Sequence, residues 1–555
     1  MWTQIYDPMG SLGLSALFAA IPLLVILVML GVMRVKGQIA AACGVLSAIV
    51  IAIAIYGMPA GLAINSTLYG AAFGVFPICW IVITAVWIYN MSVESGEFEI
   101  IKASISSLTE DRRLQALVIA VAFNCFLEGT AGFGTPVAIT AAMLAGLGFN
   151  PIFAAAVCLV ANTAPVALGG VGIPTVVAAS VTGLDFTTVA KYGVTQTGLL
   201  ALIVPLWIAV MIGGWKRVGE VLPAVIVCGV VFAVTHVGIV YYVNAYITDL
   251  LSSIILIVVL AGFFKVWKPS KIYRFDFDAP VDTNSTQKCP YSAGEIVRAW
   301  GPYIILAVLV FLWADAKIIG FKNVLVGMDK GFSFLWPGLH NEVIKTIPVV
   351  AADTPYGAKY ALNIVSATGT AILCSGILGL FLMPNYGFGK GIACFFRTLN
   401  QLKWPIFTIA CILGLAYIMN YSSMSYTLGL AFTATGSLFP FFSPLLGYLG
   451  VFLTGSDTSS CALFAAMQKT AAEQLSIDPN LLVAGNASGG VCAKMISPQS
   501  ISVACAATGM VGQEGAILRK TVAHSFAMLI VLCIMTYLQA TVLHWMLPAY
   551  EAVVK

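Results

Sequence analysis

Two carboxylates stand in otherwise apolar stretches of this chain, each among glycine, serine and threonine residues. Glu128 precedes Gly-Thr-Ala-Gly-Phe-Gly-Thr-Pro, and Asp457 lies within Thr-Gly-Ser-Asp-Thr-Ser-Ser. A carboxylate at the centre of a bilayer costs on the order of 2.5–3.5 kcal/mol, so such residues usually have a function or a partner. We interpret both as proton carriers or cation ligands. The alternative is a carboxylate that stabilises the N-terminus of a half-helix.

The small residues around the two carboxylates indicate breaks in helices at membrane depth. A broken helix exposes N–H groups that an anion satisfies, and neighbouring hydroxyls add further donors. The alternative is that small residues only let helices pack closely. The predicted substrate-binding residues of these two stretches are Gly129, Thr130, Gly132, Gly134, Thr135, Ser456, Thr458, Ser459 and Ser460.

Two later polar clusters complete the candidate site. Asn162 and Thr163 follow the first stretch, and Asn486 and Ser488 follow the second. An amide both donates and accepts, so it is suited to hold a carboxylate or hydroxyl of a small solute. The alternative is an interhelical hydrogen bond, worth about 0.6 kcal/mol.

One cation falls inside these stretches. Lys494 is predicted to pair with a substrate carboxylate, or with Asp457 when the site is empty. The alternative is a lysine that extends to the membrane interface. His236 and His524 also lie in apolar segments where they could relay protons. Neither belongs to a repeated motif, so we favour core or interface histidines.

The stretches belong to an internal repeat. Asn150-Pro151 recurs as Asp478-Pro479 at an offset of 328, and Asn162 and Pro174 recur as Asn486 and Pro498 at an offset of 324. Paired interruptions in corresponding halves of an apolar chain are the strongest sequence indication of a transporter's binding site.

The elements that position these residues are membrane helices. The chain of 555 residues is 60% hydrophobic and 9% charged, far from the roughly 25% charged of soluble domains. Its net charge of +4 does not suggest nucleic-acid binding, and its 13 cysteines form no C-x-x-C pair. No enzyme, cofactor or metal motif is present. We therefore predict an all-α polytopic membrane protein in contact with lipid on its outer faces, and no enzyme.

Twelve spans are predicted, with both termini outside. Basic residues concentrate in the loops that alternate to the cytoplasmic side, and the loop at 316–360 is placed outside although it is rich in lysine. The spans lie near 10–33, 38–57, 69–91, 151–172, 190–212, 220–244, 247–264, 299–315, 361–383, 404–424, 481–505 and 521–548.

Residues 114–148 and 440–472 do not fit as single spans. Each has two apolar arms of roughly 21–24 Å as helix, short of the roughly 30 Å of a hydrocarbon core. They are predicted as re-entrant hairpins that enter from opposite sides, within two inverted repeats. The expected segments are 1–68, 69–215, 216–315 with a cytoplasmic loop at 265–298, 316–360, 361–515 and 516–555.

The same stretches resemble the bacterial L-lactate permease family. The resemblance covers essentially the whole chain and rests on CFLEGTAGFGTP at 125–136, ANTAP at 161–165, LTGSDTSS at 453–460 and GGVCAKMISPQS at 489–500. It implies uptake of L-lactate, and often D-lactate and glycolate, with a proton across the bacterial cytoplasmic (inner) membrane. Cys461, where asparagine is expected, and Ala493, where glycine is expected, depart from the family pattern.

Residues and resemblance together predict a secondary transporter for small 2-hydroxy monocarboxylates. Symport of one proton with one anion is electroneutral, and Glu128 or Asp457 is the expected proton site. The alternatives are a sodium-coupled carboxylate transporter of the same architecture and an uncoupled anion channel. A membrane-embedded enzyme is disfavoured because no nucleophile–base pairing is visible.

Overall fold

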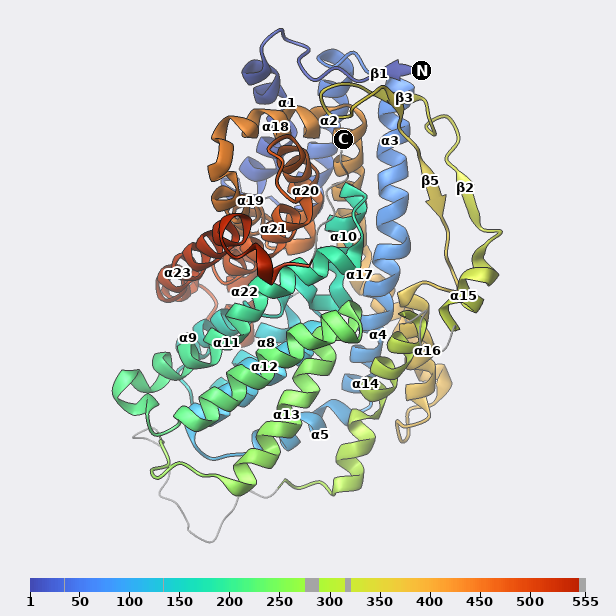
Figure 1. The fold of residues 1–555 in the computed structure, drawn as a ribbon. Coiled ribbons are helices and arrows are strands. Elements are labelled where there is room, and N and C mark those ends of the chain that lie inside the picture. The colour runs from blue at the N-terminus through green and yellow to red at the C-terminus, as the bar shows by residue number, and fades with distance from the viewer. Residues whose placement is uncertain (34, 133, 275–288, 315–320, 549–555) are drawn as a thin grey trace.

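The computed structural model describes residues 1–33, 35–132, 134–274, 289–314 and 321–548. Parts of the predicted loops at 265–298 and 316–360, and the chain beyond 548, therefore lie outside the described residues. Helices dominate the described chain (Figure 1). Eleven of them are long and apolar enough to cross a membrane, or twelve if a bent pair counts as one span. The predicted all-α polytopic membrane fold is confirmed.

The first spans are α1 (Leu12–Gly31), α2 (Gly37–Ala54) and a long segment formed by α3 (Ala60–Phe73), η1 (Gly74–Cys79) and α4 (Trp80–Glu94). The long segment begins nine residues before its predicted start at 69. Ser66 and Thr67 lie in the part of this helix that precedes residue 69. Both hydroxyls donate to the carbonyl of Ala63 inside the helix, so they impose no break.

Other predicted spans correspond to α11 (Phe186–Val218), α12 (Leu222–Tyr242), α13 (Thr248–Val266), α14 (Ala293–Ala314) and α23 (Glu514–Thr541). Two boundaries were wrong. The span at 361–383 is the short helix α16 (Thr368–Leu380), and the span at 404–424 is part of the 34-residue α17 (Phe388–Tyr421). Sequence hydropathy missed the polar first half of α17, which extends beyond the apolar stretch.

The first predicted hairpin contains α6 (Arg112–Ala116), η2 (Leu117–Phe123), α7 (Asn124–Thr130) and, after a break, α8 (Thr135–Gly146). Gly132 and Gly134 at the break have φ of 53° and 85°, a left-handed conformation that favours glycine. The second hairpin has α19 (Phe439–Thr454) and α20 (Asp457–Gln474), joined through Gly455 with φ of 71°.

The predicted spans at 151–172 and 481–505 are not single helices. The first is α9 (Pro151–Ala161), then η3 (Val166–Leu168) and α10 (Gly169–Thr182), with a bend of 64°. The second is α21 (Pro479–Lys494) and α22 (Pro498–Ala507). Proline lies at or beside each break, where it removes a helix N–H and favours the start of a new helix.

Each half of the fold packs against the other in a reciprocal way. Helix α10 of the first half contacts α20 of the second, and α22 of the second contacts α8 of the first. Likewise α11 contacts α21, and α23 contacts α9. Reciprocal pairs of corresponding elements are the contacts that an internal two-fold relation produces.

The two hairpins begin at opposite ends of the molecule (Figure 1). The first begins at α6. There the buried guanidinium of Arg113 binds Asp111, Glu220 and the carbonyls of Arg217 and Lys271, and these contacts hold three basic loops together. The second follows α18 (Met424–Phe432) and η5 (Thr433–Leu438), beside the N-terminal segment. The repeats are therefore inverted.

The N-terminal end also carries the small β-structure of the fold. After α15 (Phe321–Asp329), strand β2 (Ser333–Leu335) pairs antiparallel with β5 (Lys359–Ala361). Strand β3 (Val343–Lys345) pairs with β1 (Trp2–Thr3) in parallel and with β4 (Thr354–Pro355) antiparallel. The outer loop and the N-terminus thus lie on the same side, as the topology predicted.

Candidate functional site

The breaks of the hairpins and of the bent helices meet at one cavity of about 70 Å³, whose lining is exposed at Gln499. This volume holds more than one water molecule. Both halves of the chain contribute to its walls. The lining residues are Glu128, Gly132, Gly134, Val166, Gly169, Gly170, Ile173, Pro174, Gly455, Ser456, Asp457, Thr458, Lys494, Gln499, Ser500 and Val503.

Four helices begin at this cavity. The first turns or N-caps of α8, α10, α20 and α22 all contribute lining residues. A helix N-terminus presents unpaired N–H groups and carries a partial positive charge. Four such ends around one small space offer N–H donors to an anion.

Glu128 has partners for both of its carboxylate oxygens. Lys494 donates to Oε1 at 2.8 Å, and the amide of Asn162 donates to Oε2 at 2.9 Å. Asn162 also donates to Asn124 at 3.1 Å, which fixes its orientation. The lysine thus crosses from the second half to the carboxylate of the first, and it does not pair with Asp457, the protein partner that the sequence suggested.

Asp457 contrasts with Glu128. It is buried at 4% exposure, and none of the described residues donates a hydrogen bond to either carboxylate oxygen. It is the first residue of α20, but the capping group is Ser456, whose hydroxyl accepts from the N–H of Ser459 at 3.2 Å. An unpaired carboxylate in such a place is costly, and protonation removes most of that cost.

Two glycines leave the space that the carboxylates fill. A Cβ added to Gly169 would lie 2.7 Å from Oε1 of Glu128, and a Cβ added to Gly490 would collide with Oδ1 of Asp457. Glycine at these positions lets each carboxylate lie against a neighbouring helix backbone.

The cavity gathers some of the predicted site residues and leaves others out. Glu128, Asp457 and Lys494 line it, and Asn162 reaches it through Glu128. The further predicted residues that line it are Gly132, Gly134, Ser456 and Thr458. Those that do not line it are Gly129, Thr130, Thr135, Thr163, Ser459, Ser460, Asn486 and Ser488.

The excluded hydroxyls and amides bond within the helix bundle. Thr130 and Thr163 donate to carbonyls of their own helices, and Ser460 donates to the carbonyl of Gly447. Asn486 accepts from Gln468 at 2.9 Å and its amide lies 3.6 Å from the sulfur of Cys461. Cys461 thus contacts this network and does not line the cavity.

Sequence reasoning missed Gln499 and Ser500 as lining residues. Both follow the proline that starts α22, so their position just after a helix break could have identified them as candidates. Gly169 and Gly170, at the start of α10, carried the same signal.

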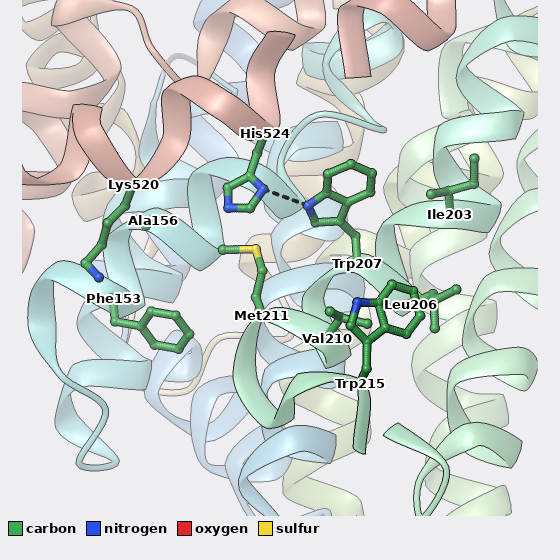
Figure 2. A pocket seen from close by; sticks show the side chains of 10 residues that line it. All are labelled: Phe153, Ala156, Ile203, Leu206, Trp207, Val210, Met211, Trp215, Lys520 and His524. Carbon is green, nitrogen blue, oxygen red and sulfur yellow. Dashed lines mark hydrogen bonds between the residues drawn. The ribbon is translucent and has the colours of Figure 1, made fainter. Parts of the chain in front are cut away.

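A larger cavity of about 570 Å³ lies elsewhere, between α9, α11 and α23 (Figure 2). Its walls are almost entirely apolar, and His524, which is among the lining residues, accepts a hydrogen bond from the indole of Trp207 at 3.0 Å. It contains none of the predicted site residues. A small hydrophilic anion needs donors, so the smaller polar cavity is the candidate site despite its size.

Within the described chain, no group of three or more histidine, cysteine, aspartate or glutamate side chains is arranged to hold a metal ion. The 13 cysteines are free. The chemistry of the cavity is therefore that of one lysine, two carboxylates and backbone N–H groups.

A multi-pass helical protein whose broken helices surround a polar cavity has the architecture of membrane transport proteins. The model of the L-lactate permease family matches residues 15–543, and the chain belongs to this family. It is accordingly a multi-pass protein of the cytoplasmic membrane.

The chain is 47% identical to "Glycolate permease GlcA" of Escherichia coli (strain K12), over 98% of this chain and 99% of the relative. It is 45% identical to "L-lactate permease" of Salmonella typhimurium (strain LT2), over 99% and 100%. Among solved structures it is similar to the Alcanivorax borkumensis YdaH transporter, with a TM-score of 0.47, 14% identity and coverage of 87% and 88%.

Proposed function

We propose that this protein imports L-lactate, and also D-lactate and glycolate, by proton symport with alternating access. The observation that carries the proposal is the contrast inside one cavity between the paired Glu128 and the unpaired Asp457. The names of the relatives, glycolate permease and L-lactate permease, indicate the class of substrate.

Substrate binding follows from the charges around the cavity. The carboxylate of the substrate takes a position near Lys494 and the helix N-termini, where N–H groups are free to donate. The hydroxyl groups of Ser500 and Thr458 are available to the 2-hydroxyl of lactate or glycolate.

The coupling of substrate to proton follows because the carboxylate of the substrate and that of Asp457 compete for the same positive groups. Asp457 in its charged form repels an incoming carboxylate, whereas the protonated form does not. Substrate therefore binds when Asp457 carries a proton, and the two move together. The complex gains no net charge, which avoids a cost of about 2.3 kcal/mol per charge per 100 mV of membrane potential.

The inverted halves supply the conformational change. Because the cavity is formed by the breaks of both halves, a rocking movement of one half against the other opens it to either side in turn.

Purified protein in liposomes tests the proposal. At one proton per lactate, an imposed gradient of one pH unit supports about tenfold accumulation. We expect Asp457→Asn to abolish this accumulation while retaining exchange of internal for external lactate. Accumulation that follows sodium and disappears in choline would establish the sodium-coupled alternative. Flux without accumulation would establish a channel.

A further inference from the structure

A second buried acid–base pair lies outside the cavity. Asp249, the second residue of α13, and His236 of α12 are 1% and 0% exposed. Oδ1 of Asp249 lies 3.5 Å from Nδ1 of His236. Within the described chain, neither carboxylate oxygen nor this nitrogen has a hydrogen-bond partner. The sequence offered no repeat signal for either residue.

The pair adjoins the hairpin that carries Glu128. A Cβ added to Gly129 would lie 2.8 Å from the backbone nitrogen of Leu250 and 3.0 Å from the Cβ of Asp249, so the start of α13 lies directly on the hairpin tip. The thiol of Cys125, also on α7, lies 3.6 Å from the carbonyl of Asp249.

The titratable and charged groups that face Asp249 are few. His236 faces it from α12, Cys125 and Glu128 from α7, and Lys494 acts on it electrostatically from α21. On its other side, Nε2 of His236 is 3.4 Å from the hydroxyl of Thr197 in α11. The pair is thus electrostatically coupled to the Glu128–Lys494 ion pair.

A purely structural role does not account for this geometry. Ordinary N–H···O hydrogen bonds measure 2.7–3.2 Å, so the 3.5 Å separation leaves both groups unsatisfied. Two ligands of this kind are also too few for a metal ion. A single proton is the ligand that satisfies both, because a carboxyl O–H donates to a neutral imidazole nitrogen.

We propose that Asp249 and His236 form a second proton-binding site, which takes up and releases a proton on the same side of the membrane and so controls when the cavity binds its substrate. On uptake, a carboxylate oxygen of Asp249 binds the proton and the carboxyl donates to Nδ1 of His236. On release the O–H bond breaks and the proton returns to water. The charge of the Asp249–His236 pair sets how strongly Lys494 is attracted to Glu128, and hence when the cavity binds an anion. This inference rests on the proposed proton symport.

The variants Asp249→Asn and His236→Gln test it in liposomes. Exchange of internal for external lactate needs no net proton movement, so we expect both variants to retain it within about twofold. Because Asp457 still carries the transported proton, accumulation driven by one pH unit should stay near tenfold. The dependence of uptake on external pH should become flatter than in the unmodified protein.

His524→Gln is the matched control. This histidine also lies in a membrane helix, but it bonds to Trp207 beside the apolar cavity. It should leave exchange, accumulation and the dependence of uptake on external pH unchanged. If Asp249→Asn does not fold, His236→Gln, which keeps the carboxylate, carries the same comparison.

An unaltered dependence of uptake on external pH in His236→Gln would overturn the inference. A dependence in Asp249→Glu as flat as in Asp249→Asn would also overturn it, because glutamate keeps the titratable group. Absence of pH-driven accumulation in the unmodified protein is a different result: it would overturn the proposed symport itself.

Discussion

At the scale of the residue, the two carboxylates of the cavity occupy similar places and differ in their partners. Glu128 is satisfied by Lys494 and Asn162, and Asp457 accepts no hydrogen bond from the described residues. The lysine makes the difference, because it lies in the half that carries Asp457 and pairs with the carboxylate of the other half. The site therefore exists only when both halves are assembled.

Removing the lysine alone should cost more stability than removing the pair. Lys494→Ala leaves Glu128 buried without its counter-charge, and breaking a buried pair costs about 3–5 kcal/mol. The double variant Lys494→Ala, Glu128→Gln leaves no charge behind and should recover most of that loss. Thermal unfolding in detergent measures both. Equal destabilisation in the single and double variants would contradict the assignment of this ion pair.

A single methyl group should disturb Asp457. In Gly490→Ala the new Cβ collides with Oδ1, so the side chain must leave its position. We expect pH-driven uptake to fall about tenfold or more, which corresponds to about 1.4 kcal/mol. Gly262→Ala in α13 meets nothing within 4 Å and serves as the control. Normal uptake by Gly490→Ala would show that Asp457 need not stay where the structure has it.

At the scale of the element, the local sequence predicted where helices break better than it predicted which side chains bind one another. Glycine and proline mark a break wherever they fall, so the hairpin tips near 131–134 and at 455–456 were visible in the sequence. The direction of a side chain was not. Thr130 and Ser460 stand in the right stretches, yet their hydroxyls bond inside the bundle, because helix rotation decides which residues face the cavity.

The long-range pairings were beyond the reach of the sequence. Nothing local connects Lys494 with Glu128, or Asp249 with the hairpin tip. Hydropathy also does not indicate where a helix bends, so the two segments that follow the hairpins were predicted as straight spans. The fold class and the two hairpin tips were predictable, and the choice of charged partners depended on the assembled tertiary structure.

The outer sheet should gain stability as pH rises. Burial lowers the pKa of Lys345 in β3 to about 8, with Lys469 adding to the effect, although its ammonium lies 3.7 Å from the centre of the Tyr356 ring. From pH 8 to 10.5 the unfolded chain holds this proton and the folded chain has released it, so stability rises with pH across that window.

Thermal unfolding at pH 8 and pH 10 measures this effect. Other groups titrate in the same range, so the comparison is with Lys345→Met, in which the contribution of this lysine is absent. The unmodified protein should gain more between the two pH values than the variant. An equal change in both would mean that Lys345 keeps its ordinary pKa when folded.

At the scale of the whole molecule, the two halves are interlocked rather than adjacent. The second arm of each hairpin packs on the bent helix of the other half, so α20 contacts α10 and α8 contacts α22. A movement of one half consequently shifts the walls of the cavity on both sides.

The pairing of β1 with β3 has a consequence for how the chain is assembled in time. Trp2 and Thr3 leave the ribosome long before their partners Val343 and Ile344, which follow more than half the chain later. The buried amide of Gln4, which donates to the carbonyls of Asn420 and Tyr421, must wait longer still. The N-terminal segment therefore stays without these partners while the first half inserts, and it docks only when the second half arrives.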